Sequence, residues 1–311
     1  WLLAISLFGF ASFGFSASLI FYDGLILAVA PPGRMDHVSA LGYGLGYLGG
    51  GLLLAVNVVM TLQPGWFGFA SQADAVRWAI LSAAIWWGLF TLPLLWVVRE
   101  PRPPGRPGWG QAVRAGLAEL LATAGHVRAV RAAALFLIAY WLYIDGVHTI
   151  MRMAVDFGLS LGFPASSLIT ALLLVQFIGF PAAIAFGWLG ARWGPRKGIY
   201  LALAVYAFVT AWGYFMDSLW QFYLLAAIIG LVQGGIQALS RSYFARLVPQ
   251  GKGGEFFGFY NMLGKFAAVL GPLVVGITAA LTGSAHLSIL AVLVLFAAGA
   301  CVLTRVPEPA G

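Results

Sequence analysis

The sequence predicts an all-α membrane protein, built as a bundle of transmembrane helices. Of its residues, 61% are hydrophobic and only 9% are charged, and the mean hydropathy is +0.93. Soluble domains carry about 25% charged residues, so this composition excludes a soluble globular protein. The apolar residues also fall into nine runs that can each cross a bilayer, which takes about 20 residues. We therefore expect nine transmembrane helices.

The nine predicted helices follow one another along the whole chain. They are Leu2–Ala30, Val38–Thr61, Trp78–Val98, Ala132–Phe157, Ser166–Ala191, Gly198–Met216, Leu219–Phe244, Phe256–Leu281 and Leu287–Leu303. Several contain Gly or Pro, so we expect some of them to be kinked or tilted. Gly42, Gly46 and Gly50 form a ridge of small residues on the second run, which is typical of closely packed membrane helices.

Basic residues predict the orientation of the bundle. If alternate loops are assigned to one side, that side receives Arg34, Arg99, Arg102, Arg106, Arg114, Arg128, Arg131, Arg192, Arg196, Lys197, Arg241, Arg246, Lys252 and Arg305. The opposite loops receive Arg77 and at most Arg152. By the positive-inside rule, the C-terminus is then cytoplasmic and Trp1 lies outside. Because the basic residues are spread over many loops, the net charge of +7 indicates membrane topology and not nucleic-acid binding.

The longest predicted loop divides the chain into three parts. It begins with a Pro-rich stretch and continues with apolar residues on one helical face, namely Trp109, Val113, Leu117, Leu120 and Ala124. This pattern fits either an amphipathic helix on the cytoplasmic membrane surface or a solvated linker. We therefore expect a partial N-terminal half with three helices in 1–98, a basic linker in 99–131 and a six-helix C-terminal half in 132–311.

A weak internal repeat relates the two halves. Pro31-Pro32-Gly33-Arg34 follows the first run and Pro249-Gln250-Gly251-Lys252 follows the seventh, and the same separation relates Leu45-Gly46 to Leu263-Gly264. Both copies leave the membrane on the same predicted side, as in the parallel repeats of transporters. The first three runs would then be counterparts of the last three, and the repeat predicts three further helices before Trp1.

A polar stripe lies on the predicted helix Ala132–Phe157. Asp145, His148, Arg152 and Asp156 recur at a spacing that places them on one helical face. A charged side chain in a bilayer costs about 2.5–3.5 kcal/mol, so this face should meet other helices or a wet cavity. Asp145 and His148 could carry a coupling proton, and Arg152 with Asp145 could bind a zwitterion. Alternatively, Arg152 pairs with Asp156 and only stabilises the helix.

Other polar residues inside the runs are further candidates for contact with a solute. Lys265 lies deep in the eighth run, one turn after Asn261, and we expect it to pair with Asp145 or Asp23 unless it extends to the interface. The remaining candidates are Gln176, Gln233, Gln237, Tyr22 and Asp23. Hydrogen bonds between helices are an equally good explanation of the glutamines.

Enzyme motifs are absent from the sequence. Gly264-Lys265 is followed by Phe266, so there is no P-loop, and neither a His-Glu-x-x-His motif nor a Gly-x-Ser-x-Gly elbow occurs. The four histidines are scattered, and the lone Cys301 excludes an internal disulfide. We therefore expect no catalytic residues, no metal and no cofactor.

Several segments resemble a known family of transporters. They are Val38–Gly42, Tyr143–Val147, Val175–Phe177, Gly230–Tyr243 and Glu255–Lys265. Together they resemble the vacuole-effluxer-like family of the major facilitator superfamily, which includes fungal autophagy-related vacuolar amino-acid exporters and bacterial relatives. The resemblance implies a major-facilitator-type bundle in which the nine runs are helices 4–12 of twelve. It also implies a monomeric secondary transporter in a bacterial plasma membrane, which moves a small solute, such as an amino acid, by proton-coupled alternating access.

One loop departs from the pattern of the superfamily. The resemblance places its cytoplasmic gating loop at Gly187, Arg192, Gly194, Arg196 and Lys197, but Ala191 stands where an Asp is customary. The competing hypothesis for the whole chain is a membrane-embedded lipid-handling protein or enzyme that uses the polar stripe. It would need a catalytic pair or a lateral opening to lipid, and no motif supports either.

Overall fold

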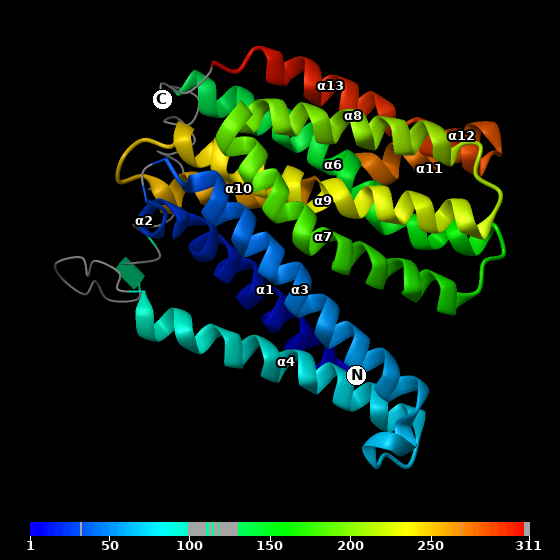
Figure 1. Cartoon of the computed structure of the whole chain (residues 1–311). Coiled ribbons are helices and arrows are strands. Elements are labelled where there is room, and N and C mark those ends of the chain that lie inside the picture. Colours follow the sequence, from blue (N-terminus) through cyan, green and yellow to red (C-terminus); the bar gives the residue numbers. More distant parts are fainter. Residues whose placement is uncertain are drawn as a thin grey trace.

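The computed structural model describes residues 1–31, 33–98, 110–111, 114, 118, 130–267 and 269–307. The described chain confirms the all-α prediction (Figure 1). Its helices are α1 (Leu2–Gly24), α2 (Ile26–Val29), α3 (Met35–Leu62), η1 (Pro64–Phe67), α4 (Gln72–Val97), α6 (Arg131–Ser160), α7 (Ala165–Trp193), α8 (Pro195–Gly213), α9 (Leu219–Leu247), α10 (Gly253–Phe266), α11 (Leu270–Thr282), α12 (Ala285–Leu290) and α13 (Leu293–Thr304). Most of the predicted linker 99–131 lies outside the described residues, so its amphipathic helix stays a prediction.

Eight of the nine predicted runs form helical segments that are long and apolar enough to cross a membrane, among the residues described. The remaining run, Gly198–Met216, forms α8, which has 19 residues and carries Arg196 and Lys197 in its first turn. These two charges lower its apolarity, although α8 packs against α7, α9 and α13 inside the bundle. The chain is therefore an integral, multi-pass membrane protein.

Three of the predicted spans are divided into two helical segments, and the first of them, Leu2–Ala30, forms α1 and α2. The run Phe256–Leu281 forms α10 and α11, with the break between Phe266 and Leu270, and the last run forms α12 and α13. Pro272 lies in the first turn of α11, where its missing N–H is tolerated because the first turn has no intrahelical acceptor for it. In this run the kink expected from its Gly and Pro residues is thus a complete break in the helix.

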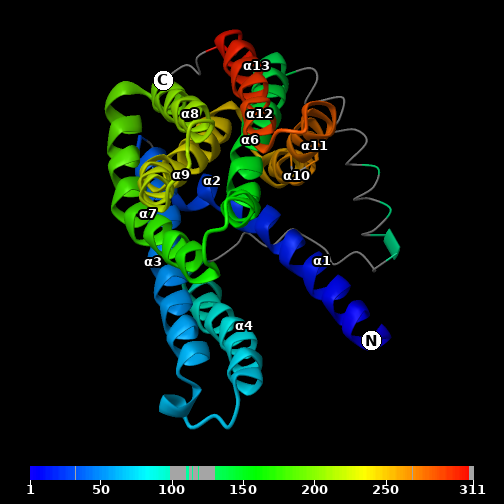
Figure 2. The ribbon, with the colours of Figure 1, turned by 90° about the vertical axis from the view of Figure 1, so that its right-hand side faces the viewer.

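The helices form two groups that meet along one seam. Figure 1 shows α1, α3 and α4 on one side and the helices from α6 onward on the other. Along the seam, α3 packs lengthwise against α7 and also contacts α9, while α10 contacts α1. In Figure 2, the start of α1 and much of α4 point away from the later helices, and the side chains of α1 are largely exposed. We call α1–α4 the first half and α6–α13 the second half.

The two halves come together most closely at one end of the bundle. There the end of α1 meets the start of α10, with Gly24 next to Gly253, and the start of α3 meets the end of α9. We call this the basic end, because Arg34, Lys197 and Lys252 lie there at or next to the starts of α3, α8 and α10. At the opposite end, α1 and α4 diverge from the second half (Figure 2).

Candidate functional site

A polar cavity of about 460 Å³ lies between the two halves. Helices α1 and α3 line it from the first half, and α6, α7, α9 and α10 line it from the second. Its polar lining residues are Tyr22, Asp23, Tyr43, Tyr47, Tyr140, His148, Gln176, Gln237, Arg241, Tyr260 and Asn261. The cavity is therefore rich in hydroxyl and amide groups and contains one carboxylate, one guanidinium and one imidazole.

Six of the eleven residues predicted for substrate binding or coupling line this cavity. They are Tyr22, Asp23, His148, Gln176, Gln237 and Asn261. The structure brings them together from five helices that are far apart in the sequence, although their roles in binding and coupling stay predictions. The other five, Asp145, Arg152, Asp156, Gln233 and Lys265, lie elsewhere.

A buried ion pair between the halves forms part of the cavity wall. The Arg241 guanidinium donates to Oδ1 of Asp23 at 3.1 Å, and both side chains are less than a tenth exposed. Arg241 also donates to the hydroxyl and carbonyl oxygens of Ser39, at 3.0 Å each, and its guanidinium lies 4.7 Å from the centre of the Tyr43 ring. The second oxygen of Asp23 accepts from Asn261 at 3.0 Å. Each charge is thus fully partnered, as burial requires.

Arg241 is the functional candidate that the sequence reasoning missed. It was assigned to a loop at the cytoplasmic side, and the structure contradicts this, because the residue lies inside α9 and is 4% exposed. Two signals could have identified it. Arg241 falls within the predicted run Leu219–Phe244, and it continues the spacing of Gln233 and Gln237 by one more turn. A charge inside an apolar run is a functional candidate by default.

A second buried contact joins the halves closer to the basic end. Asp36, in the first turn of α3, is 1% exposed and accepts hydrogen bonds from Ser242 and Arg246 of α9. Helix α3, which carries Asp36, also packs closely against α7. A Cβ added at Gly187 of α7 would lie 2.3 Å from Cβ of Ala40 of α3. Gly187 was predicted to belong to a loop, but it lies inside α7, where only glycine permits this close approach.

The rest of the predicted gating loop contacts its own half. Gly194 joins α7 to α8 with a φ of +89°, which favours glycine, and Arg192 lies over the ring of Trp188. Arg196 donates to the backbone oxygens of Thr304 and Val306, and Lys197 is exposed. The carboxylate that links the halves at this level comes from α3 instead, through Asp36.

Asp145 is completely buried but does not line the polar cavity. Its two oxygens accept hydrogen bonds from the backbone N–H groups of Leu270 and Gly271, each at 3.0 Å, at the start of α11. The hydroxyl of Thr149, one turn along α6, lies 3.5 Å from Oδ1 of Asp145. The partner of this carboxylate is therefore the N-terminus of a helix.

The expected pairing of Lys265 with Asp145 or Asp23 is wrong. The Lys265 side chain is exposed, donates to Ser16 of α1 at 2.6 Å and lies over the ring of Phe15. Both carboxylates are already engaged, Asp145 by α11 and Asp23 by Arg241 and Asn261. Lys265 also points toward α1, away from Asp145.

The polar stripe of α6 divides among three environments. Asp145 packs against α11 and His148 lines the cavity, whereas Arg152 and Asp156 are exposed. The alternative Arg152–Asp156 ion pair does not form in the described structure. The four residues share a helical face, but α6 is covered by neighbouring helices at Asp145 and open farther along, so burial differs with depth.

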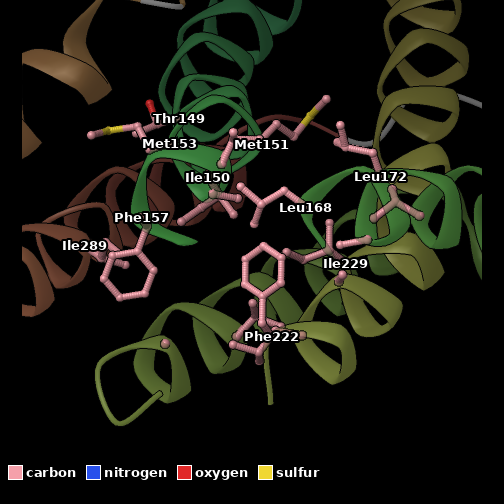
Figure 3. Close-up of a pocket in the computed structure, with 18 of the residues that line it drawn as sticks. Thr149, Ile150, Met151, Met153, Phe157, Leu168, Leu172, Phe222, Ile229 and Ile289 are labelled. Atoms are coloured by element: carbon pink, nitrogen blue, oxygen red, sulfur yellow. The ribbon is translucent and has the colours of Figure 1, made fainter. Parts of the chain in front are cut away.

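A second cavity, of about 310 Å³, lies inside the second half and is almost entirely apolar (Figure 3). Helices α6, α7, α8, α9, α11 and α12 line it, and Leu54 is its contribution from α3. Figure 3 shows Phe157, Leu168 and Phe222 gathered around it. Its polar side chains are Thr149, Gln176, Thr210 and Gln233, so Gln233 faces this cavity and Gln176 borders both.

A polar cavity between two groups of membrane-spanning helices is the architecture of a secondary transporter. Comparisons with known proteins agree with this interpretation of the fold. The family model described as "Vacuole effluxer Atg22 like" matches residues 32–311. The chain is 38% identical over 317 residues to the uncharacterized MFS-type transporter YxiO of Bacillus subtilis, covering 99% of this chain and 72% of that protein. The chain therefore belongs to the Atg22-like vacuole effluxer family of the major facilitator superfamily.

Fungal proteins of the same family are more distant. Autophagy-related protein 22 of Yarrowia lipolytica is 30% identical over 281 residues, which cover 78% of this chain and 47% of that protein. Autophagy-related protein 22-1 of Penicillium rubens is 26% identical over 265 residues, covering 77% of this chain and 44% of the fungal protein. This chain thus spans less than half of these fungal relatives.

Proposed function

We propose that this protein is a secondary active transporter that moves a small solute across the membrane by alternating access, coupled to protons. The observation that carries the proposal is the polar cavity between the halves, closed at the basic end by the buried pair Asp23–Arg241 and by the pair of the buried Asp36 with the partly exposed Arg246. At the other end the halves diverge (Figure 2). By the positive-inside rule the basic end is cytoplasmic, so this arrangement is closed to the cytoplasm.

Opening of the basic end would require both links to break. Removing one partner from a buried ion pair costs about 3–5 kcal/mol, because a desolvated charge is left unpaired. The links can therefore separate at low cost only if water or a solute takes the place of the lost partner. This requirement couples the opening of the cavity to what the cavity contains.

A zwitterion such as an amino acid has the chemistry to replace both partners. Its carboxylate would bind Arg241, its ammonium group would bind Asp23, and the surrounding amides and tyrosine hydroxyls would hydrogen-bond to the rest. This assignment replaces the Arg152 and Asp145 pair, because Asp145 is engaged by α11 and lies outside the cavity. Asp23 and His148 are the cavity groups that could carry the coupling proton.

The test is transport by the full-length protein in proteoliposomes. We expect labelled amino acids to move when a pH gradient is imposed, and we expect Arg241→Ala and Asp23→Ala to abolish the flux. Arg77→Ala, which removes an exposed arginine paired with Asp74, is the matched control and should transport normally. If no amino acid moves, or if Arg241→Ala transports like the wild type, the proposed substrate class or site is wrong.

A further inference from the structure

Helix α11 begins without a capping residue of its own. Its N-cap is Val269, whose side chain has no hydrogen-bond acceptor, followed by Leu270 and Gly271. The first N–H groups of any helix lack intrahelical acceptors. In a membrane each unsatisfied group costs several kcal/mol, so these donors need a partner from elsewhere.

Asp145 supplies that partner from a different helix. Its carboxylate accepts the N–H of Leu270 through Oδ2 and the N–H of Gly271 through Oδ1, each at 3.0 Å. The next residue, Pro272, has no N–H to satisfy. One carboxylate from α6, 125 residues away, therefore accepts from both donors in the first turn of α11.

The close approach of α6 and α11 depends on Gly271. A Cβ at this position would lie 1.7 Å from the hydroxyl oxygen of Thr149 and 2.9 Å from Oδ1 of Asp145. No side chain fits there. The glycine and the aspartate thus form a matched pair that attaches the start of α11 to α6.

The two segments of this interrupted span have different attachments. Segment α10 contacts both halves, because Asn261 donates to Asp23 and Lys265 donates to Ser16, while Tyr260 stacks on Tyr140 of α6 and Phe244 of α9. Segment α11 is linked to α6 of the second half through Asp145. The break between Phe266 and Leu270 therefore separates a segment that bridges the two halves from one that is attached to α6.

We propose that Asp145 is a positioning residue, not a solute ligand. It caps α11 in trans and holds the start of α11 against α6 of the second half. This capping role does not depend on the proposed transport function, and it is tested separately.

Amide hydrogen exchange of the full-length protein in lipid nanodiscs tests the cap. In Asp145→Ala, the amides of Leu270 and Gly271 should exchange about tenfold faster or more, because a lost cap destabilises a helix start. Asp145→Asn keeps the shape and one acceptor oxygen, so a smaller increase is expected even if the alanine variant folds poorly. Asp156→Ala, an exposed position on the same helix, is the control and should leave these amides unchanged.

A local cap should replace the distant one. Adding Val269→Ser to Asp145→Ala provides a hydroxyl acceptor at the N-cap, and we expect slow exchange to return at Gly271, the second residue of the helix, whose N–H an N-cap side chain can reach. Unchanged exchange in both Asp145 variants would overturn the capping role. If the double variant restores slow exchange but not wild-type flux, Asp145 acts directly on solute or protons, and the positioning role is wrong. A wild-type protein that moves no solute would refute the transport proposal alone and leave the exchange result intact.

Discussion

Arg241 of α9 and Asp23 of α1 form an ion pair across the two halves, and they are 218 residues apart. The same separation relates Pro31 to Pro249 and Leu45 to Leu263, the matches that define the internal repeat. The acid and the base therefore occupy equivalent positions in the two copies of the repeat. Equivalent positions meet only near the axis that relates two copies, so this pair marks the centre of the seam between the halves.

Breaking this pair should be costly, whereas removing it completely should be less so. We expect Asp23→Ala and Arg241→Ala each to destabilise the protein by about 3–5 kcal/mol, because each leaves a buried charge alone. The double variant Asp23→Ala/Arg241→Ala should lose clearly less than the sum of the two, which a double-mutant cycle of unfolding in detergent measures.

The exposed pair Asp74–Arg77 provides the matched control for that cycle. It has the same chemistry and the same distance of 3.1 Å, but the Arg77 side chain is 79% exposed. We expect a coupling energy below about 1 kcal/mol there, because water screens exposed charges. Equal coupling energies for the two pairs would show that burial adds nothing to the coupling energy of Asp23–Arg241.

The link between Asp36 and Arg246 should control access to the cavity from the basic end. In a Cys301→Ser background, Gly46→Cys provides a thiol in the cavity wall, at a position where a Cβ meets no other atom. We expect Arg246→Ala to increase labelling of this thiol severalfold when a membrane-impermeant thiol reagent is added on the basic side. The reason is that Asp36 loses its charged partner and the start of α3 can separate from α9.

Arg192→Ala is the control for this labelling experiment. Arg192 is also a basic residue at the basic end, but it lies over Trp188 of its own helix and makes no ion pair among the described residues. Its removal should leave the labelling rate unchanged. A rate that stays at the wild-type level in both Arg246→Ala and Asp36→Asn would show that this link does not close the cavity.

The sequence was sufficient to predict the helices but not how they meet. Apolar runs are local signals, so each of the nine predicted runs is helical in the described structure, although three of them are divided into two segments. How deeply a side chain is buried, and which groups it contacts, depends on distant parts of the chain. This is why Arg241 was placed in a loop and Lys265 was assigned a carboxylate that it does not contact. Asp145 is the clearest case, because its partners are backbone N–H groups, which no pattern of residue types reveals.

Variants of two glutamines one turn apart on α9 can show which of the two cavities binds the solute. Gln237 lines the polar cavity and Gln233 lines the apolar one. If the solute binds in the polar cavity, Gln237→Ala should raise the KM for transport about five- to tenfold, the effect of one lost hydrogen bond. Gln233→Ala should change KM by less than about twofold, because it removes no group from the polar cavity. The opposite order would place the solute in the apolar cavity.

Filling the apolar cavity of about 310 Å³ should stabilise the second half. Protein interiors are close-packed, and side chains that line a void lose dispersion contacts with the atoms that are missing. Ala226 is buried in the wall of this cavity, so Ala226→Leu should raise the free energy of unfolding by about 0.5–2 kcal/mol. Ala204→Leu adds the same atoms at an exposed position on α8, so its stability should stay close to that of the wild type. Thermal unfolding of both variants in the same detergent measures the two changes. If Ala226→Leu lowers the melting temperature while Ala204→Leu does not, the added side chain competes with atoms already there, and the space is not a void.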